Sequence, residues 1–125
     1  MHILVGTDGS EGAGRAVEFA ARLSKDLKAS LKIVHVVTVD DPPLDAHNDH
    51  ASLARKRAEA LGAVDVQSES LAGTDIAETL IEAAGRDEAD LIVVGKRGLA
   101  RLTGLLLGSV SQRLVSAAPC AVTVV

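Results

Sequence analysis

The chain has 125 residues, of which 47% are hydrophobic and 24% are charged, with a formal net charge of −4. This balance excludes an intrinsically disordered chain, and the length suits one folded domain, 1–125. No apolar run approaches the roughly 18 residues of a membrane span, so no membrane partner is expected. Acidic residues outnumber basic ones, 17 to 13, and tryptophan and tyrosine are missing, so no nucleic-acid partner is expected. A single cysteine cannot form an internal disulfide, which indicates a cytoplasmic location.

Short apolar runs alternate along the chain with stretches whose apolar residues recur at helical spacing. This alternation is typical of β-α-β units around a parallel sheet. Right-handed crossovers then predict an α/β fold, a three-layer, doubly wound sandwich with a five-stranded parallel sheet. The expected elements are a strand at 3–5, a helix at 11–27, a strand at 31–39, a helix at 52–61, a strand at 64–69, a helix from 74 to 86, a strand at 91–94, a helix at 109–117 and a strand at 121–125.

Several local signals refine this outline. Ser10 is expected to cap the first helix and Thr74 the third, while Gly62 is expected to end the second. The segment 64–69 alternates and is strongly polar, which favours an edge strand. His35 lies inside an apolar strand, so we expect a core or dimer-contact histidine whose hydrogen bonds are satisfied, rather than a ligand.

The polar segment Leu44–His50 contains several side chains of the types that bind metals, namely Asp45, His47, Asp49 and His50. A metal site needs these groups to be held at fixed positions, and a polar loop between two elements provides no such geometry. We therefore expect solvated side chains here and no metal site made by the protein.

Two loops that contain glycine follow the first and fourth expected strands. The first is Gly6–Ser10, and the second starts at Gly95 and leads to Gly108 and Ser109 at the beginning of a helix. Ligands of open α/β sheets bind beyond the carboxyl ends of the strands, where the strand order reverses. Glycines let the backbone approach a phosphate closely, and a helix start directs free N–H groups toward the same place. The chain has neither a P-loop sequence nor a G-x-G-x-x-G after the first strand, so this phosphate site would be of another kind.

The spacing Gly95-x2-Gly98-x9-Gly108-Ser109 resembles the nucleotide motif of the ATP-binding universal stress proteins, and the resemblance extends over nearly the whole chain. It implies a Rossmann-like sheet, similar to that of the adenine nucleotide alpha hydrolases, with strand order 3-2-1-4-5. It also implies an ATP site in which Mg or Mn bridges the phosphates, with no metal ligand and no catalytic residue assigned to the protein. The implied cofactor-binding residues are Thr7, Asp8 and Val36 near the adenosine, Val94 at the base or ribose, and Gly95, Lys96, Arg97, Gly98, Gly108, Ser109 and Val110 around the phosphates.

Some residues of this motif have a second interpretation. Asp8 also has the properties of a turn-forming residue at a helix start. Lys96 and Arg97 either contact phosphate or are simply solvated. The stretch between the second and third strands is shorter than is usual in the family, which puts a lid over the pocket in doubt.

Three functions are compatible with the sequence. The first is a regulatory stress-response protein whose nucleotide occupancy is the signal for a protein partner of unknown identity. The uncharged strand 121–125 would then pair with a second subunit to form a homodimer, as is common in the family. The second is a slow ATPase or phosphoryl-transfer enzyme, for which Asp8 is the only well-placed acid. The third is a dimeric interaction module that binds no nucleotide.

Overall fold

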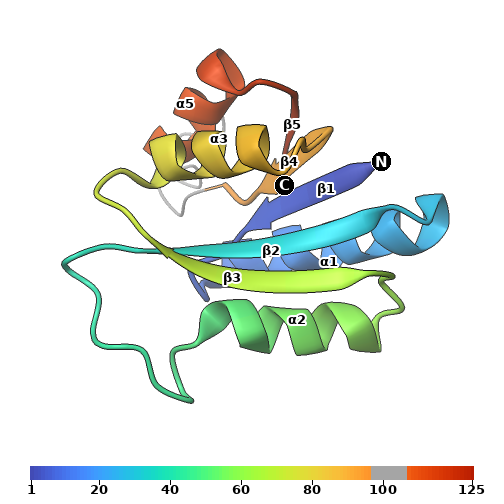
Figure 1. The fold of residues 1–125 in the computed structure, drawn as a ribbon, viewed down its shortest axis with the longest axis horizontal. Helices are drawn as coiled ribbons and strands as arrows, with labels where there is room; N and C mark the ends of the chain where they lie inside the picture. The colour runs from blue at the N-terminus through green and yellow to red at the C-terminus, as the bar shows by residue number, and fades with distance from the viewer. Residues whose placement is uncertain (97–106) are drawn as a thin grey trace.

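The structure is a computed structural model that describes residues 1–96 and 107–125 (Figure 1). Its five strands form one sheet in the order β3-β2-β1-β4-β5, and every neighbouring pair is parallel. The predicted fold class and strand order are therefore confirmed. The elements are β1 (His2–Gly6), α1 (Glu11–Leu27), β2 (Ser30–Val37), α2 (His50–Ala60), β3 (Val66–Ala72), α3 (Ile76–Arg86), β4 (Leu91–Val94), α5 (Ser109–Ala117) and β5 (Ala121–Val124).

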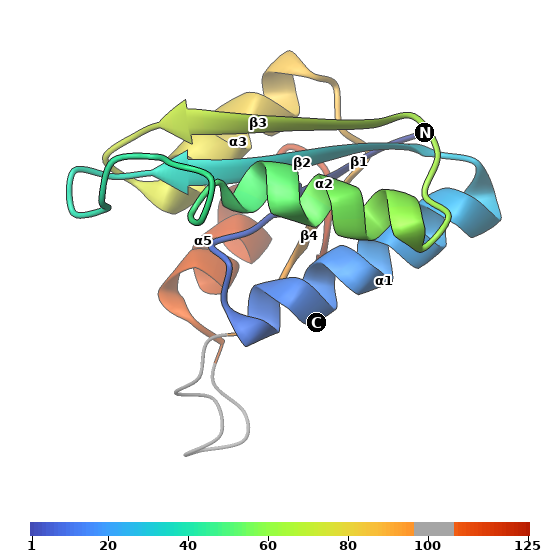
Figure 2. The ribbon, with the colours of Figure 1, turned by 90° about the horizontal axis from the view of Figure 1, so that it is seen from below.

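Helices cover both faces of the sheet, α1 and α2 on one and α3 and α5 on the other (Figures 1 and 2). Successive side chains of a strand point to opposite faces, so the strands contribute to two cores. In β1, Val5 packs toward α1 and α2, while Leu4 packs toward α3 and α5, and neither is accessible to solvent. This explains why the central strands are continuously apolar rather than alternating.

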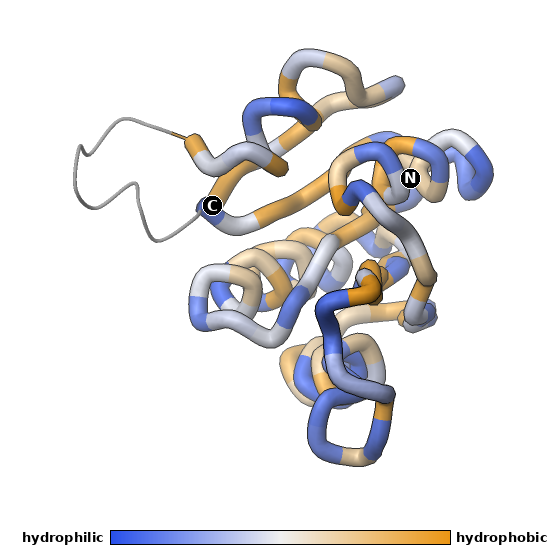
Figure 3. The backbone as a smooth tube through the Cα atoms, turned by 90° about the vertical axis from the view of Figure 1, so that its left-hand side faces the viewer, coloured by the Kyte–Doolittle hydropathy of each residue, from blue (hydrophilic) through white to orange (hydrophobic). Residues whose placement is uncertain are grey.

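The hydropathy pattern follows these layers (Figure 3). Hydrophobic residues concentrate along β1 and β4, β3 at the edge of the sheet is largely polar, and hydrophobic and hydrophilic residues alternate along the helices. A helix of this kind buries one stripe against the sheet and leaves the opposite stripe in water. Within the described part of the chain, no helix combines the length and the apolar character that a bilayer crossing requires.

Several element boundaries differ from those expected. The third helix is capped by Asp75, whose Oδ1 accepts the Glu78 N–H at 2.9 Å, so the expectation for Thr74 was wrong. Both residues are common cap types, but only Asp75 directly precedes the first helical residue. The second strand ends at Val37, two residues before the expected end. The chain leaves the sheet beyond this point, and Val39 is 91% exposed.

The second helix begins at His50, two residues before the predicted start, because the Asp49 side chain accepts the Ser52 N–H and caps it. It ends as expected before Gly62, which has φ +95°. The Ser10 cap of α1 is also confirmed, with Oγ accepting the Ala13 N–H at 3.2 Å. The third strand is an edge strand, as predicted, but it runs to Ala72.

Candidate nucleotide site

A hollow opens at the carboxyl ends of the strands, beside β1 and β4, where the strand order reverses. Counted out to its open mouth, it has a volume of about 550 Å³. Five segments that are distant in the sequence form it: the turn after β1 with the first turn of α1, the β2 strand, the first two turns of α3, the end of β4 and the first turn of α5. Its lining residues are Gly6, Thr7, Asp8, Ser10, Ala13, Val34, Val36, Ile76, Leu80, Val94, Gly95, Lys96 and Val110.

The walls of this hollow are mainly apolar and its rim is polar. Val36 of β2 and Leu80 of α3 are both buried, 5% and 2% exposed, and they face the hollow from different layers. Asp8 and Lys96 are exposed and contribute opposite charges at the rim. Apolar walls with a few convergent polar groups are typical of small-molecule sites and suit a flat, aromatic ligand with a charged tail.

The turn between β1 and α1 is held by its own hydrogen bonds. Thr7 N–H donates to the Val34 carbonyl of β2 at 2.9 Å, and Thr7 Oγ1 accepts the Gly9 N–H at 3.2 Å. Asp8 Oδ1 accepts the Ser10 N–H at 2.9 Å, so this carboxylate shapes the turn as well as lining the hollow. The turn-forming interpretation of Asp8 is therefore confirmed, and its contact with a nucleotide stays a prediction.

Gly95 lies where the end of β4 passes the first turn of α1. A Cβ at this position would lie 2.5 Å from the carbonyl oxygen of Gly12 and 3.1 Å from the backbone nitrogen of Ala13. Backbone atoms cannot rotate out of the way as a side chain can, so only glycine fits here. The glycine is thus required by the packing of the protein itself, whether or not a phosphate approaches it.

The amino-terminal end of α5 borders the hollow through Val110. Its cap residue is Gly108, with φ −70° and ψ 167°, and it offers no side-chain hydrogen bond to the helix. Ser109, the first helical residue, is exposed. The first N–H groups of a helix carry a partial positive charge, which attracts an anionic group that lies close to them.

The structure brings most of the predicted binding residues together. Those that line the hollow are Thr7, Asp8, Val36, Val94, Gly95, Lys96 and Val110, whereas Gly108 and Ser109 begin the adjoining helix without being part of the lining. Arg97 and Gly98 lie outside the described residues.

The loop Gly6–Ser10 was expected at this place, but sequence reasoning missed Ala13, Val34, Ile76 and Leu80 as residues of the site. One signal was available, because Val34 and Val36 alternate onto the same face of β2. In the sequence, Ile76 and Leu80 look like ordinary core residues. They belong to the apolar stripe of α3 that packs on the sheet, and the same stripe also reaches the hollow.

Carboxylates of the segment between β2 and α2 bind backbone groups. Asp45 Oδ1 accepts the His47 N–H at 2.7 Å, and Asp49 caps α2. In the described ranges 1–96 and 107–125, no three His, Cys, Asp or Glu side chains gather in a way that could hold a metal ion.

His35 differs from the prediction of a satisfied core histidine. Its side chain is 5% exposed, but Nδ1 has no hydrogen-bond partner among the described residues. The ring contacts instead that of His50 at the start of α2, edge to face, with 5.0 Å between the centroids. The sequence did not indicate this, because the contact joins residues that are separated by the whole β2–α2 segment.

Comparisons with known proteins agree with this architecture. Residues 1–125 match the family model described as the Universal stress protein family. A Thermus aquaticus protein named "Universal stress protein in QAH/OAS sulfhydrylase 3'region" is 36% identical over 132 residues, covering 98% of this chain and 96% of that protein. Universal stress protein Rv1636 of Mycobacterium tuberculosis is 32% identical over 123 residues, covering 86% of this chain and 84% of its own.

Solved structures superpose over the whole chain. The crystal structure of Rv1636 has a TM-score of 0.69 and 33% identity, covering 99% of this chain and 93% of that one. The crystal structure of a universal stress protein in complex with cAMP has a TM-score of 0.81 and 29% identity, covering 100% of this chain and 96% of that one.

Proposed function

Because this chain belongs to the universal stress protein family, we propose that it is an ATP-binding regulatory protein of the stress response whose nucleotide occupancy is its signal. One observation carries the proposal: an apolar hollow and the amino-terminal end of α5 lie side by side at the switch point of the sheet. The apolar part suits the adenine ring, and the helix end suits the phosphates. A relative with bound cAMP supports an adenine nucleotide as the ligand class.

The described residues divide naturally between the two ends of a nucleotide. Val36, Val94 and Leu80 provide apolar surface for the base, and Asp8 lies on the rim for the ribose. Lys96 and the α5 helix end supply positive charge for the phosphates. Arg97 and Gly98 would complete the phosphate loop, as the motif implies.

The charge of bound ATP calls for a divalent cation, Mg or Mn. Asp8 is the only carboxylate among the described lining residues, which is too few for a cation held by protein groups alone. The cation would be bound mainly by phosphate oxygens and water, which is the usual coordination of Mg in nucleotide sites. It would neutralise phosphate charge and so add to the affinity for ATP.

The acidic groups of the hollow favour regulation over catalysis. Hydrolysis needs a base that orients the attacking water, and Asp8, the only described acid of the hollow, accepts a hydrogen bond from its own turn. Turnover of ATP that disappears in Asp8→Asn, while ATP binding survives, would establish the enzymatic alternative instead.

Calorimetric titration with ATP and Mg, and separately with adenosine, tests the proposal. The informative variant is Ser109→Glu, because a carboxylate in the first turn of α5 stabilises the helix yet repels phosphate. We expect micromolar ATP binding in the wild type, at least a tenfold loss in Ser109→Glu, and unchanged adenosine binding. Gln112→Glu, on the same helix, is the matched control and should bind ATP like the wild type. No heat from either ligand in the folded wild type would refute nucleotide binding and leave the interaction module.

We further propose a cytoplasmic homodimer formed through β5. This strand lies at the edge of the sheet, next to β4, and its sequence Ala121–Val124 carries no charge and no proline. An uncharged edge strand is prone to pair with another chain, and a two-fold axis would pair it with its own copy. Sedimentation should show a dimer at micromolar concentration, and a monodisperse monomer would contradict this arrangement.

A further inference from the structure

A second hollow lies between α1 and α2, and it shares a wall with the nucleotide site. Thr7 and Ser10 line both hollows, so the turn that contains them separates the two. The second hollow is also bordered by His50 and Leu53 from the start of α2. Figure 2 shows α1 and α2 side by side on this face of the sheet. A shift of the first turn of α2 would therefore act directly on a wall of the nucleotide site.

His50 is the side chain of α2 that touches this wall. It lies so close to Gly9, the residue between Asp8 and Ser10, that a Cβ at Gly9 would come within 2.4 Å of two ring atoms. Gly9 has φ +81°, a conformation that also favours glycine. The imidazole of His50 thus occupies the space over Gly9, and it also contacts the ring of His35.

The surroundings of His35 disfavour a positive charge on its ring. Burial lowers the pKa of His35 most, and the nearby His50 lowers it further. The carboxylates of Asp41, Asp8 and Asp49 act in the opposite direction, from the β2–α2 segment, the β1–α1 turn and the cap of α2. On β3, the residue paired with His35 is the uncharged Ser70.

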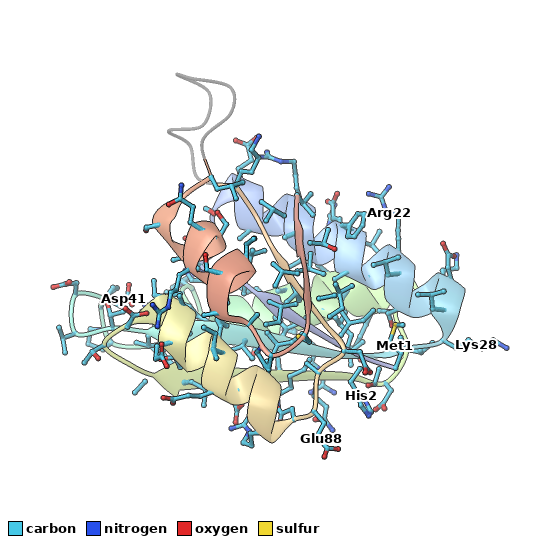
Figure 4. All side chains as sticks on the ribbon, turned by 90° about the horizontal axis from the view of Figure 1, so that it is seen from above. Met1, His2, Arg22, Lys28, Asp41 and Glu88 are labelled. Carbon is cyan, nitrogen blue, oxygen red and sulfur yellow. The ribbon has the colours of Figure 1, made fainter. Side chains whose placement is uncertain are left out.

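These groups all lie near the carboxyl ends of the strands. In Figure 4, Asp41 lies at that end of the molecule, whereas Met1 and His2 lie at the opposite end, where β1 begins. The candidate nucleotide site opens at the carboxyl ends of the strands as well. Burial and the nearby His50 together outweigh the carboxylates and lower the pKa of His35, so the neutral ring is the form that the fold accommodates.

We propose that His35 and His50 form a proton-sensitive joint between α2 and the Thr7–Ser10 turn, through which acidification weakens nucleotide binding. When the His35 ring becomes charged, it carries a positive charge in a buried place, with its centroid 5.0 Å from that of the His50 ring. The first turn of α2 then moves away from Gly9, and the turn that lines the nucleotide site loses its support. The last step rests on the proposed nucleotide function, whereas the joint itself does not.

The direction of the pH effect follows from the lowered pKa. The folded protein binds fewer protons at His35 than the unfolded chain does, so the native contact is fully favourable above the ordinary histidine range, at a pH above roughly 6.5. As the pH falls below that value, the contact progressively loses stability. Between roughly pH 7.5 and pH 5.5 the joint should therefore loosen rather than tighten.

Amide hydrogen exchange tests the joint without any nucleotide. In the wild type, the protection factors of amides in the first turn of α2 should fall at least fivefold between pH 7.5 and pH 5.5. His50→Gln removes the ring that faces His35, and its protection factors should fall less than those of the wild type, because only the burial of His35 then opposes the charged ring. His47→Gln, an exposed histidine of the same segment, is the matched control and should behave like the wild type. Unchanged wild-type protection, or an equal fall in His50→Gln, would overturn the joint.

Histidine ring titration by NMR gives a second readout that needs no variant. The His35 ring should titrate below the ordinary histidine pKa of roughly 6.5. Titration of His35 at or above that value would also overturn the proposal, because it would show that the fold does not disfavour the charged His35.

Affinity for cAMP, whose phosphodiester keeps the same charge over this range, tests the effect on the site. Wild-type affinity should fall about fivefold from pH 7.5 to pH 5.5. His50→Gln should lose less affinity than the wild type over the same range. A wild-type affinity that is equal at both pH values would overturn the effect on binding. If cAMP binds at neither pH, the nucleotide function fails, and the exchange data still decide whether the joint exists.

Discussion

Replacing Gly95 with alanine should destabilise the protein through a contact between two backbone segments. The added methyl carbon would lie 2.5 Å from the Gly12 carbonyl oxygen and 2.7 Å from its carbonyl carbon, well inside contact distance. Relief requires the end of β4 and the first turn of α1 to separate by several tenths of an ångström. Overpacking of this kind costs about 1–3 kcal/mol.

Thermal and urea unfolding measure this cost. At about 4 °C per kcal/mol for a domain of this size, Gly95→Ala should melt roughly 4–12 °C below the wild type. Gly14→Ala is the matched control on the same helix, because a Cβ there has no atom within 4 Å. Alanine favours a helix over glycine by roughly 0.5–1 kcal/mol, so this variant should be more stable than the wild type.

The two variants together test the reasoning. If Gly95→Ala unfolds at the wild-type urea midpoint, the close approach of β4 and α1 does not limit the residue, and the packing explanation for this glycine is wrong. If Gly14→Ala is destabilised as strongly as Gly95→Ala, the general cost of substituting glycine near α1, rather than the contact with Gly12, explains the result.

Three further predictions concern the rest of the fold. Asp75→Ala should cost about 1 kcal/mol in urea unfolding through loss of the α3 cap, whereas Thr74→Ala should stay within about 0.5 kcal/mol; equal losses would mean that the cap is misassigned. Leu114→Ala should lower the free energy of unfolding by about 2–5 kcal/mol, because this side chain is fully buried between α5 and the sheet. A loss below about 1 kcal/mol would contradict this, because it would mean that neighbouring side chains move in to fill the cavity. Arg86 holds the pKa of Asp87 below its usual range, so Arg86→Ala should cost at most about 1 kcal/mol at pH 7, the range of solvent-screened pairs. That difference should shrink as the pH falls through the aspartate range; a difference that is constant from pH 7 to pH 3 would exclude the ion pair as its cause.

Much of the fold could be predicted from local patterns. Leu91–Val94 and Ser109–Ala117 have the boundaries in the structure that the sequence predicted. Apolar runs and helical periodicity report burial directly, because a strand covered on both faces must be apolar throughout. Cap residues were harder to predict, since Thr74 and Asp75 are neighbours of equal chemical suitability and only the backbone path chooses between them.

The parts of the candidate site that consist of turns and glycines could be predicted from short stretches of sequence. The turn after β1 and the glycine that follows β4 were identified because turns and glycines have local signatures. Ile76 and Leu80 were not identified as site residues, because a helical stripe that packs on a sheet looks the same in sequence whether or not part of it borders a hollow.

The sequence by itself therefore determined the α/β class, the order of elements and the place of the hollow that forms the candidate site, because burial and turns leave periodic or local marks on a chain. Only the tertiary structure decided that Gly95 meets the backbone of Gly12, and that His35 meets His50 over Gly9. Such contacts join positions far apart in sequence, and their distances depend on how whole elements pack. No local pattern encodes that packing, which is why the joint and the close approach appear only in the folded molecule.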